Sequence, residues 1–474
     1  MSLISKHIFA RRVLPLLSMA ASACSSSNPA TDPTPAATSP DSGSAVADSV
    51  PPAPEMGPCA KALNLPSERT ALGAGRQLRI PLSAAALAFA PDVAQQEDPV
   101  DAWIDNGTLV VRAGYASGEV AMIVQCNNGE GLPLPLSIKA PAWSLLSKWD
   151  GLADVPTAPP SREYFSFWQD QGDANRLFML GGFQYQPKQF TPSNDLWAFN
   201  VSAKTWSLVA PTGTLPAHGG ARLVSSPTER AAYLMGGIQD DASGNTTVVP
   251  MAKKLSYDGA SFTIADAPKS TAAPESYTGS LVYDAKRARY LSVCGTTNLG
   301  PKCNIHTYTE AAGFVALPVA AGTAPKSRTG FHYAMDAAND RVVLFGGTVS
   351  SGNPPLIGDT WALQLGESPA RWVKLSDEVP ESAKRRNGGY VHDAEANRLF
   401  VWGGTPDGAT SVAGIQVLDL TAGHERWFSF SPASHPDDRT SAMMLHDATG
   451  KRLIAGMGNN RRGVYGDLWE LSLP

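Results

Sequence analysis

Six short hydrophobic runs, each ending in glycine, constrain the fold of this chain more than any other feature. Their last glycines are separated by 55, 58, 52, 57 and 54 residues, so the chain repeats itself with a nearly constant period. A period of roughly fifty residues built on strands is typical of a β-propeller, in which each repeat forms one blade. The runs are 176–182, 230–237, 287–295, 341–347, 398–404 and 451–458.

Each run is followed by a loop, a third strand segment and, in most repeats, an aromatic residue that opens a fourth strand. Those aromatic residues are Trp206, Phe262, Phe314, Trp372 and Trp427. A glycine pair, an aromatic third strand and a later tryptophan together resemble the kelch repeat, over residues 141–474. The resemblance implies four-stranded blades. The third repeat departs from it most, because Cys294 replaces the first glycine.

The two ends of the repeat region complement each other. The sixth repeat stops at Pro474 after its third strand, whereas residues 142–149 form a strand-like segment that has no partners of its own. An open edge would leave backbone groups unpaired. We therefore expect residues 142–147 to be the fourth strand of the last blade. The predicted fold is all-β, with a six-bladed kelch β-propeller over 141–474 closed by this N-terminal strand.

A smaller domain is predicted to precede the propeller, over residues 57–140. Apolar residues alternate with others in segments 77–82, 118–126 and 132–138, and turn signals such as DNG and NNGEG separate the segments. This period of two predicts a small antiparallel β-sandwich. The pattern resembles the immunoglobulin-like or cadherin-like modules found beside bacterial repeat domains. Such a module is expected to act as a spacer, with binding as the alternative.

The first 24 residues have the features of an export signal. A basic segment precedes the apolar stretch 13–23, which ends in small residues just before Cys24. This order resembles a bacterial lipoprotein signal with Cys24 as the lipidated residue, and an ordinary secretory signal is the alternative. Residues 25–56 are rich in Ser, Pro, Ala, Thr and Asp, so we predict a disordered tether. The expected location is extracytoplasmic, lipid-anchored to the bacterial outer membrane, either periplasmic or at the cell surface.

The charge of the exported chain argues against nucleic acid as a partner. Loss of Lys6, Arg11 and Arg12 with the signal changes the formal net charge from −5 to −8. A protein that binds nucleic acid needs a basic surface to neutralise phosphates. Membrane association is therefore expected through the lipid alone, because no apolar run after residue 23 is long enough to span a bilayer.

The cysteines fit an oxidising compartment. The chain has five, and if Cys24 carries lipid, four remain. We predict the disulfides Cys59–Cys126 and Cys294–Cys303, each confined to one domain. A metal site is the alternative, but these spacings match no common zinc pattern.

Candidate binding residues are expected where the innermost strands begin. In a propeller these strands converge on the axis, and the loops before them line one mouth of the central channel. Small residues come directly after the basic residue in these loops, because the strands nearest the axis have little room for side chains. By repeat equivalence, the predicted ring comprises Arg162, His218, Ser276, Arg328, Arg386 and Arg439, to which a loop after the last glycine pair adds Arg461 and Arg462.

This ring of basic residues has two interpretations. Converging guanidinium groups suit carboxylates, sulfates or acidic peptides, because the planar fork donates paired hydrogen bonds. Some kelch adaptors that resemble this arrangement bind acidic peptides in this way. The alternative is structural, since kelch arginines at this position often donate to backbone carbonyls between blades.

Two histidines at first resemble a metal pair. His392 and His446 each precede an aspartate in a short turn. Tyr283 and Met335 occupy the same position in other repeats, so this is a hairpin position in which the neighbouring aspartate shapes the turn. No metal or other cofactor is predicted.

The kelch resemblance allows two enzymatic interpretations. Galactose oxidase holds copper with tyrosines, histidines and a crosslinked cysteine, but the assigned disulfides leave this chain no free cysteine. Periplasmic sialic-acid epimerases are six-bladed kelch propellers that act on a carboxylated sugar, and here Glu163 and His218 are the nearest acid/base candidates.

The sequence as a whole favours a non-catalytic binding module of the bacterial cell envelope. Its predicted ligand is a protein, or an anionic glycan or peptide, at the arginine-lined mouth. The epimerase-like enzyme and a purely structural envelope protein are the alternatives. The identity of the ligand and the oligomeric state stay open.

Overall fold

Strands dominate the computed structural model, so the predicted all-β class is confirmed. The predicted signal with Cys24, and the predicted tether up to residue 55, lie outside the described residues. Within the described ranges no helix combines the length and the hydropathy that crossing a membrane requires. The structure describes residues 56–93, 100–149, 157–186, 189–240, 244–349, 356–376, 380 and 383–474.

The first part of the described chain consists of two small sheets with a common core. One sheet has the order β1-β7-β6-β3 and the other β2-β5-β4. All pairs are antiparallel except β1 with β7, which is parallel, so the expected purely antiparallel arrangement is wrong at that edge. The elements are α1 (Pro58–Leu63), β1 (Thr70–Gly73), β2 (Gln77–Pro81), α2 (Ala84–Leu87), β3 (Asp92–Val93), β4 (Val100–Asp105), β5 (Thr108–Ala113), β6 (Gly118–Gln125) and β7 (Gly131–Lys139).

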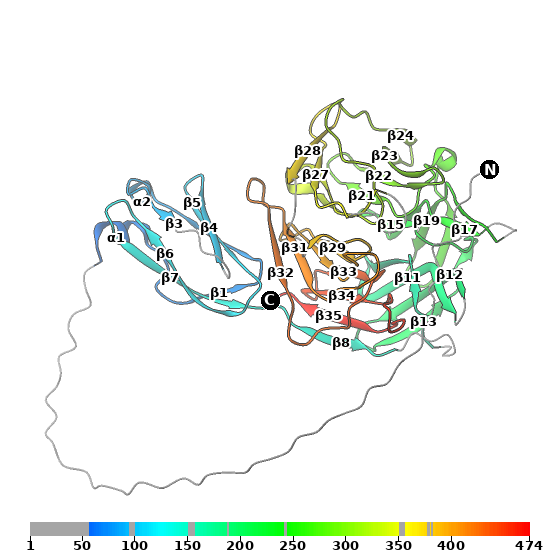
Figure 1. Ribbon diagram of the computed structural model, residues 1–474, viewed down its shortest axis with the longest axis horizontal. Coiled ribbons are helices and arrows are strands. Elements are labelled where there is room, and N and C mark those ends of the chain that lie inside the picture. Colours follow the sequence, from blue (N-terminus) through cyan, green and yellow to red (C-terminus); the bar gives the residue numbers. More distant parts are fainter. Residues whose placement is uncertain are drawn as a thin grey trace, which may run out of the picture. The chain divides into compact units, whose positions relative to one another are not determined.

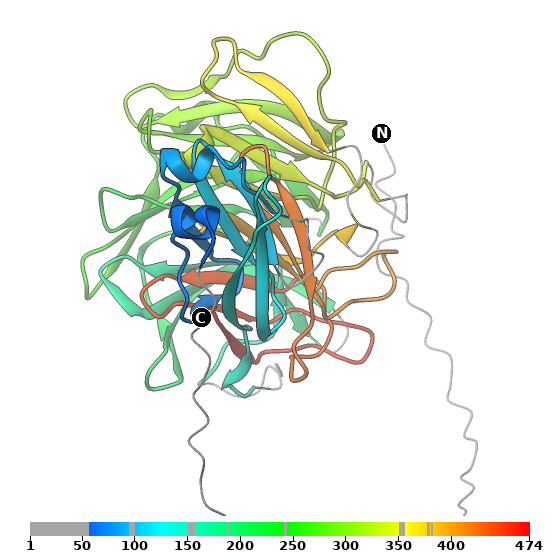
Figure 2. The same ribbon diagram turned by 90° about the vertical axis from the view of Figure 1, so that its left-hand side faces the viewer.

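Alternating residues of both sheets point into this core, as the period of two predicts. Leu109 and Val111 of β5 face Met122 and Val124 of β6, and all four are fully or almost fully buried. The helices α1 and α2 contact each other at one end of these strands (Figure 2). Burial of these side chains is the main source of stability for so small a pair of sheets.

Both predicted disulfides are present. Cys59 of α1 is bonded to Cys126, which follows β6, so the disulfide ties the helix to a sheet. Cys294 is bonded to Cys303 across the hairpin formed by β22 and β23. Each bond lies within one of the predicted domains.

The described part of 141–474 contains six sheets that each have four antiparallel strands in a row, and a separate two-stranded sheet, β17-β18 (Figure 1). The first three comprise β10 (Ser166–Asp170), β11 (Asp173–Gln186), β12 (Gln189–Asn200) and β13 (Thr205–Val209); β15 (Arg222–Ser225), β16 (Ala231–Met235), β19 (Ala252–Tyr257) and β20 (Phe262–Asp266); β21 (Ser280–Asp284), β22 (Arg289–Thr297), β23 (Gly300–Thr309) and β24 (Gly313–Ala316). Short additional elements are β9 (Arg162–Glu163), β14 (Thr212–Gly213), β17 (Ile238–Asp240), β18 (Thr246–Val248) and the 3₁₀ helices Ser270–Ala272 and Ala337–Asn339.

The last three sheets follow the same plan. They comprise β25 (His332–Asp336), β26 (Arg341–Phe345), β27 (Thr360–Gln364) and β28 (Arg371–Ser376); β29 (Gly389–Asp393), β30 (Arg398–Trp402), β31 (Ile415–Asp419) and β32 (Arg426–Phe430); β33 (Met443–Asp447), β34 (Arg452–Gly456), β35 (Leu468–Ser472) and β8 (Trp143–Ser147). The expected pairing of the N-terminal segment with the last repeat is therefore confirmed, because β8 pairs antiparallel with β35.

The glycine pairs end the second strand of most of these sheets. At Gly347 the backbone has φ of +86°, and a Cβ atom there would lie 2.6 Å from the carbonyl oxygen of Thr329. A residue with a side chain would be strained in that conformation and would clash with the backbone. The glycines therefore serve the turn, which brings the chain close to the loop before the first strand.

The first strands of the six sheets neighbour one another in a closed cycle. β10 contacts β15, and the contacts continue through β21, β25, β29 and β33, which returns to β10. This arrangement is consistent with a β-propeller-like fold whose first strands surround a common axis.

Within the unit Pro58–Pro474, Ala74 and Tyr115, which follow β1 and β5, share a core with residues of the fifth and sixth four-stranded sheets. Tyr115 is buried and its ring stacks on Phe430 at a centroid distance of 4.7 Å. Arg398, fully buried in β30, donates to the hydroxyl of Tyr115 at 3.1 Å and to the carbonyl of Ala74 at 2.7 Å. These contacts join residues more than 280 positions apart in the sequence.

Candidate functional site

A ring of six residues with left-handed backbone conformation lies where the six first strands begin. Their φ angles lie between +50° and +68°, and one residue comes from each repeat. We call this set the axial ring: Tyr164, Gly220, Thr278, Gly330, Asn387 and Ser441. Four of the six are not glycine. Such strained backbone persists only where the surrounding structure enforces it, and it is frequent at functional sites.

Backbone hydrogen bonds connect neighbouring members of the axial ring. In four of the six repeats the amide of the ring member donates to the carbonyl of the member from the preceding repeat. These bonds are Gly220 to Tyr164 at 2.7 Å, Thr278 to Gly220 at 3.0 Å, Asn387 to Gly330 at 3.3 Å, and Ser441 to Asn387 at 2.8 Å. The ring thus joins the repeats and fixes the position of the residues that follow it.

A cavity of about 220 Å³ lies among the axial ring and the first residues of the innermost strands. All six repeats contribute to its lining. Aromatic and thioether side chains form much of the wall, including Phe165, Phe331, Met443 and Met444. Polar and apolar groups contribute in similar measure to this lining, and small-molecule sites combine both kinds of group.

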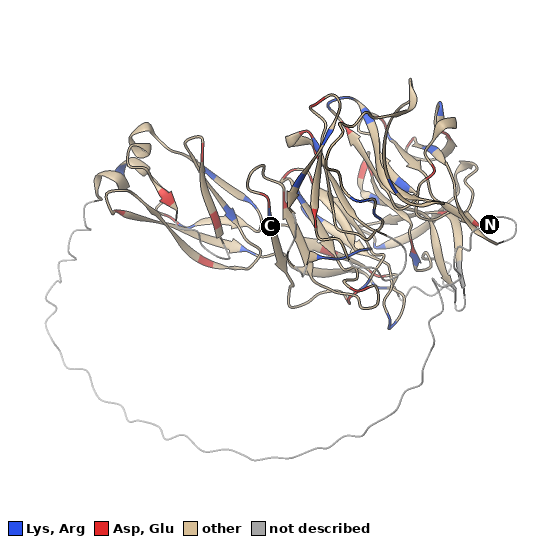
Figure 3. Ribbon diagram, turned by 45° about the horizontal axis from the view of Figure 1, so that its top comes forward, with Lys and Arg blue, Asp and Glu red and all other residues tan. Residues whose placement is uncertain are grey.

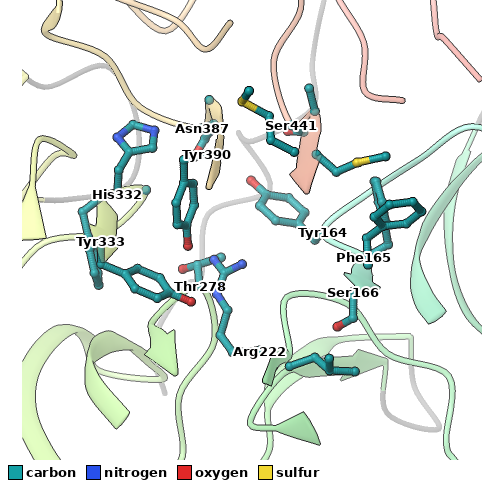
Figure 4. Close-up of a pocket in the computed structure, with 18 of the residues that line it drawn as sticks. Tyr164, Phe165, Ser166, Arg222, Thr278, His332, Tyr333, Asn387, Tyr390 and Ser441 are labelled. Atoms are coloured by element: carbon teal, nitrogen blue, oxygen red, sulfur yellow. The ribbon is translucent and has the colours of Figure 1, made fainter. Parts of the chain in front are cut away.

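Arg222 of β15 is the one charged side chain among the described residues that line this cavity. Figure 4 shows its guanidinium pointing between the hydroxyl groups of Tyr333 and Tyr390. Within the described chain no acceptor or carboxylate pairs with Arg222, and its Nε is buried without a hydrogen-bond partner. A guanidinium in this position has donors available for an anion.

Hydroxyl groups beside Arg222 stay protonated. Burial raises the pKa of Tyr390 well above its ordinary value, and the nearby Tyr333 raises it further. The pKa of Tyr164 is also raised, first by burial and then by Glu163 and Tyr277. Both phenols therefore remain able to donate a hydrogen bond across the physiological pH range.

His332, the neighbour of Tyr333 on β25, is neutral in this cavity wall. Burial lowers its pKa to about 3, and the positive charges of Arg385 and Arg222 contribute further. Its side chain is 1% exposed, and neither ring nitrogen has a hydrogen-bond partner in the described structure. The positive charge of the lining therefore comes from Arg222.

Three of the predicted mouth arginines are enclosed by protein instead of facing the channel. Arg162, Arg328 and Arg439 are at most 1% exposed. Each Nη1 donates to the carbonyl at the end of the second strand, at 2.9, 3.1 and 3.3 Å respectively. Such bonds to backbone carbonyls are those expected if the arginines have a structural role. Because the three side chains are enclosed and do not line the cavity, a ligand there cannot contact them.

The same three arginines each pair with an aspartate that lies on the third strand or directly before it. The distances are 2.5 Å to Asp195, 2.6 Å to Asp359 and 2.5 Å to Asp467. Although burial raises it, hydrogen bonds from Arg328 and Trp361 hold the pKa of Asp359 below its ordinary value. The sequence carries a signal for this role, because NDLW, GDTW and GDLW occur only in repeats that begin with these arginines.

The fifth repeat requires a correction. The residue equivalent to Arg328 is Arg385, not Arg386, because Arg385 donates to the carbonyl of Gly403 at 2.9 Å. Arg386 lies one residue nearer the axial ring, pairs with Thr405 in an isolated bridge, and is half-buried. Its charge acts on Tyr164, so it does lie near the axis. Adjacent arginines made the register ambiguous in the sequence.

The other predicted residues are dispersed. His218 is 1% exposed, and its Nδ1 contacts the carbonyl of Pro216 at 3.0 Å. Ser276 is half-buried and its carbonyl accepts from Gly237. Arg461 and Arg462 are exposed, and Arg462 pairs with Asp438. None of these four lines the cavity.

The catalytic and metal candidates do not come together either. Asn459 donates to Glu163, and neither Glu163 nor His218 is among the lining residues. His392 contacts Asn397 at 3.0 Å, as expected for a hairpin position. The described residues contain no group of three or more His, Cys, Asp or Glu side chains suited to a metal ion.

Arg222 and the cavity tyrosines were missed in the sequence. The sequence does contain a signal for Arg222, which appears when the repeats are aligned. In most repeats the residue at the predicted ring position lies 18 residues before the carbonyl at the end of the second strand, and this spacing gives the alignment. Four residues after that position the other repeats have Ser166, Ser280, His332, Gly389 and Met443, where the second has Arg222. A charged residue at a position otherwise without charge indicates a site. No protein-family model matches the chain.

Proposed function

We propose that residues 141–474 form a six-bladed kelch-type β-propeller behind an immunoglobulin-like module, in a lipid-anchored protein of the bacterial cell envelope. The six four-stranded sheets and the closed cycle of their first strands support the propeller. The pairing of β8 with β35 supports its closure by an N-terminal strand. The two disulfides suit a compartment outside the cytoplasm.

The function that the geometry supports best is non-catalytic binding of an anionic ligand group on the axis. The observation that carries this proposal is Arg222, a guanidinium that lines the cavity and has no partner among the described residues. By contrast, Arg162, Arg328 and Arg439 are each paired with an aspartate. An arginine that protein groups leave unsatisfied has hydrogen bonds to offer a ligand, and these are strong when the acceptor is charged.

The size of the cavity limits what enters it. A volume of about 220 Å³ accommodates one small group, so a glycan or peptide would insert a single anionic residue and keep the rest outside. Arg386, near the axis, would attract the same charge. The ring of arginines expected from the sequence is thus replaced by a site centred on Arg222.

The epimerase alternative loses its acid/base candidates in this geometry. A general base must reach the proton it abstracts, directly or through one water. His218 is enclosed and Glu163 is bonded to Asn459, and neither lines the cavity. We therefore favour binding over turnover.

A thermal-shift screen of the purified protein against anions tests this function. Ligand at a hundred times its Kd stabilises the folded state by about 2.7 kcal/mol, which raises Tm measurably. We expect an anion-dependent rise in Tm that Arg222→Gln abolishes. The matched control is Arg371→Gln, which removes a half-exposed guanidinium on the outer strand β28. Equal shifts in wild type and Arg222→Gln would overturn the proposal.

A further inference from the structure

The positive charge of the cavity favours a ligand that carries a negative charge. Arg222 supplies one positive charge, and no Asp, Glu or Lys stands among the described lining residues. His332 is neutral at physiological pH because burial and two nearby arginines lower its pKa to about 3. Arg222 can balance the charge of a monoanion inside the cavity. The charges of Arg385 and Arg386, which lie outside the lining but act on His332 and Tyr164, add to the positive potential there.

The geometry of the donors favours a planar acceptor. A guanidinium presents its N–H groups in a flat fork that matches the two oxygens of a carboxylate. The hydroxyls of Tyr333 and Tyr390 lie on one side of Arg222 in Figure 4, and Tyr164 lies on the other. Tyr333 accepts the amide of Leu281 at 3.2 Å and is hydrogen-bonded to Tyr390, so the two hydroxyls form a pair beside Arg222. A carboxylate at this point would accept from the guanidinium and from one hydroxyl of the pair.

The rest of the cavity suits the body of a small ring. Phe165, Phe331 and the two methionines of β33 give it apolar walls. An engineered apolar cavity of about 150 Å³ is known to bind benzene, so about 220 Å³ has room for a six-membered ring and a carboxylate. An extended peptide or a chain of sugars does not fit in that volume.

We propose that the axial cavity binds a small monocarboxylate carried on a six-membered ring, with Arg222 and Tyr390 holding the carboxylate. This inference rests on the proposed function, and it specifies the ligand class of the same site. Two classes of compound carry a carboxylate on a six-membered ring, namely aromatic acids and sugar acids. Benzoate and glucuronate represent them.

Calorimetric titration of the purified protein tests the proposal with benzoate, glucuronate, propionate, phosphate and sulfate. We expect benzoate or glucuronate to bind at least tenfold more tightly than propionate, which lacks the ring, and than both inorganic anions. Arg222→Gln should weaken that binding at least tenfold. Tyr390→Phe, which keeps the aromatic ring and removes the hydroxyl, should weaken it about threefold. Arg371→Gln should leave it unchanged.

The outcomes separate the two proposals. If phosphate or sulfate binds as tightly as the ring acids and depends on Arg222, the anion-binding function stands and the ring-carboxylate inference fails. If propionate equals the ring acids, the ring is irrelevant and the inference also fails. If none of the five anions binds, both proposals are overturned. A Tm of unliganded Arg222→Gln within 2 °C of wild type ensures that loss of binding is not loss of fold.

Discussion

Arg328 donates a hydrogen bond to the carboxylate of Asp359 at 2.6 Å, although the sequence pointed to Arg328 as a ligand contact. The arginine side chain is fully buried, and the aspartate side chain is 16% exposed. The bond ties the loop before the first strand of the fourth sheet to its third strand. Asp359 also accepts the indole N–H of Trp361 at 2.7 Å. The pair therefore belongs to the framework of the repeat.

Removing this arginine is expected to destabilise the fold. Arg328→Ala leaves Asp359 without its cation and Gly346 without a donor, and breaking a buried pair costs about 3–5 kcal/mol. Arg371→Ala, which breaks the exposed pair with Glu367, should cost less than about 1 kcal/mol. Denaturant unfolding measures both. A stable Arg328→Ala variant that had lost ligand binding would restore the original ring hypothesis.

The repeat period and hydrophobic alternation were sufficient to predict the sheets, the closing pair and both disulfides. The sheets of the repeat region follow from a local pattern that recurs six times, and the disulfides follow from assigning two cysteines to each predicted domain. The site was harder to predict, because whether an arginine is buried in an ion pair or faces the cavity depends on which residues lie near it in the fold. Arg162 and Arg222 look equally available in the sequence, yet only the first has an aspartate on a third strand nearby. The position of Asp195 relative to Arg162 is a property of the folded sheet.

The contact between Arg398 and Tyr115 predicts cooperative unfolding. Because Tyr115 shares a core with Phe400 and Trp402, the region before residue 141 should not unfold separately from the repeats. Tyr115→Ala should lower the stability of the whole protein by about 3 kcal/mol or more, through loss of a buried aromatic ring. Calorimetry should record one transition, and intrinsic tryptophan fluorescence should follow it.

A milder variant at the same position separates packing from hydrogen bonding. Tyr115→Phe keeps the ring stacked on Phe430 but removes the acceptor of the Arg398 bond. We expect a loss of about 1–2 kcal/mol. Two well-separated transitions in wild type would contradict the prediction for both variants.

The two disulfides should differ in what they contribute. The bond Cys59–Cys126 spans 67 residues and Cys294–Cys303 spans 9. The loop-entropy model gives about 4 kcal/mol for the longer span and about 3 kcal/mol for the shorter. Double serine variants of each pair, compared by denaturant unfolding, measure the difference. A larger loss from the shorter span would show that loop entropy is not the dominant contribution.

Acid should destabilise the protein partly through His332. Its pKa is lowered to about 3 in the folded protein, by burial and by Arg385 and Arg222, whereas in the unfolded chain it is close to 6.5. Between these values the unfolded state binds more protons, so the free energy of unfolding falls as pH falls below 6.5. By pH 4 the loss from this group is expected to reach about 3 kcal/mol.

The variant His332→Phe isolates that contribution. A phenyl ring keeps the stacking against Phe345, whose ring centroid lies 5.7 Å from that of His332, but it cannot take up a proton. Aspartates with lowered pKa, such as Asp195 and Asp359, titrate in both proteins and cancel in the comparison. Unfolding free energies measured from pH 7.5 to 4 should therefore fall more steeply in wild type than in the variant. Parallel curves would mean that the imidazole of His332 is accessible to protons in the folded state.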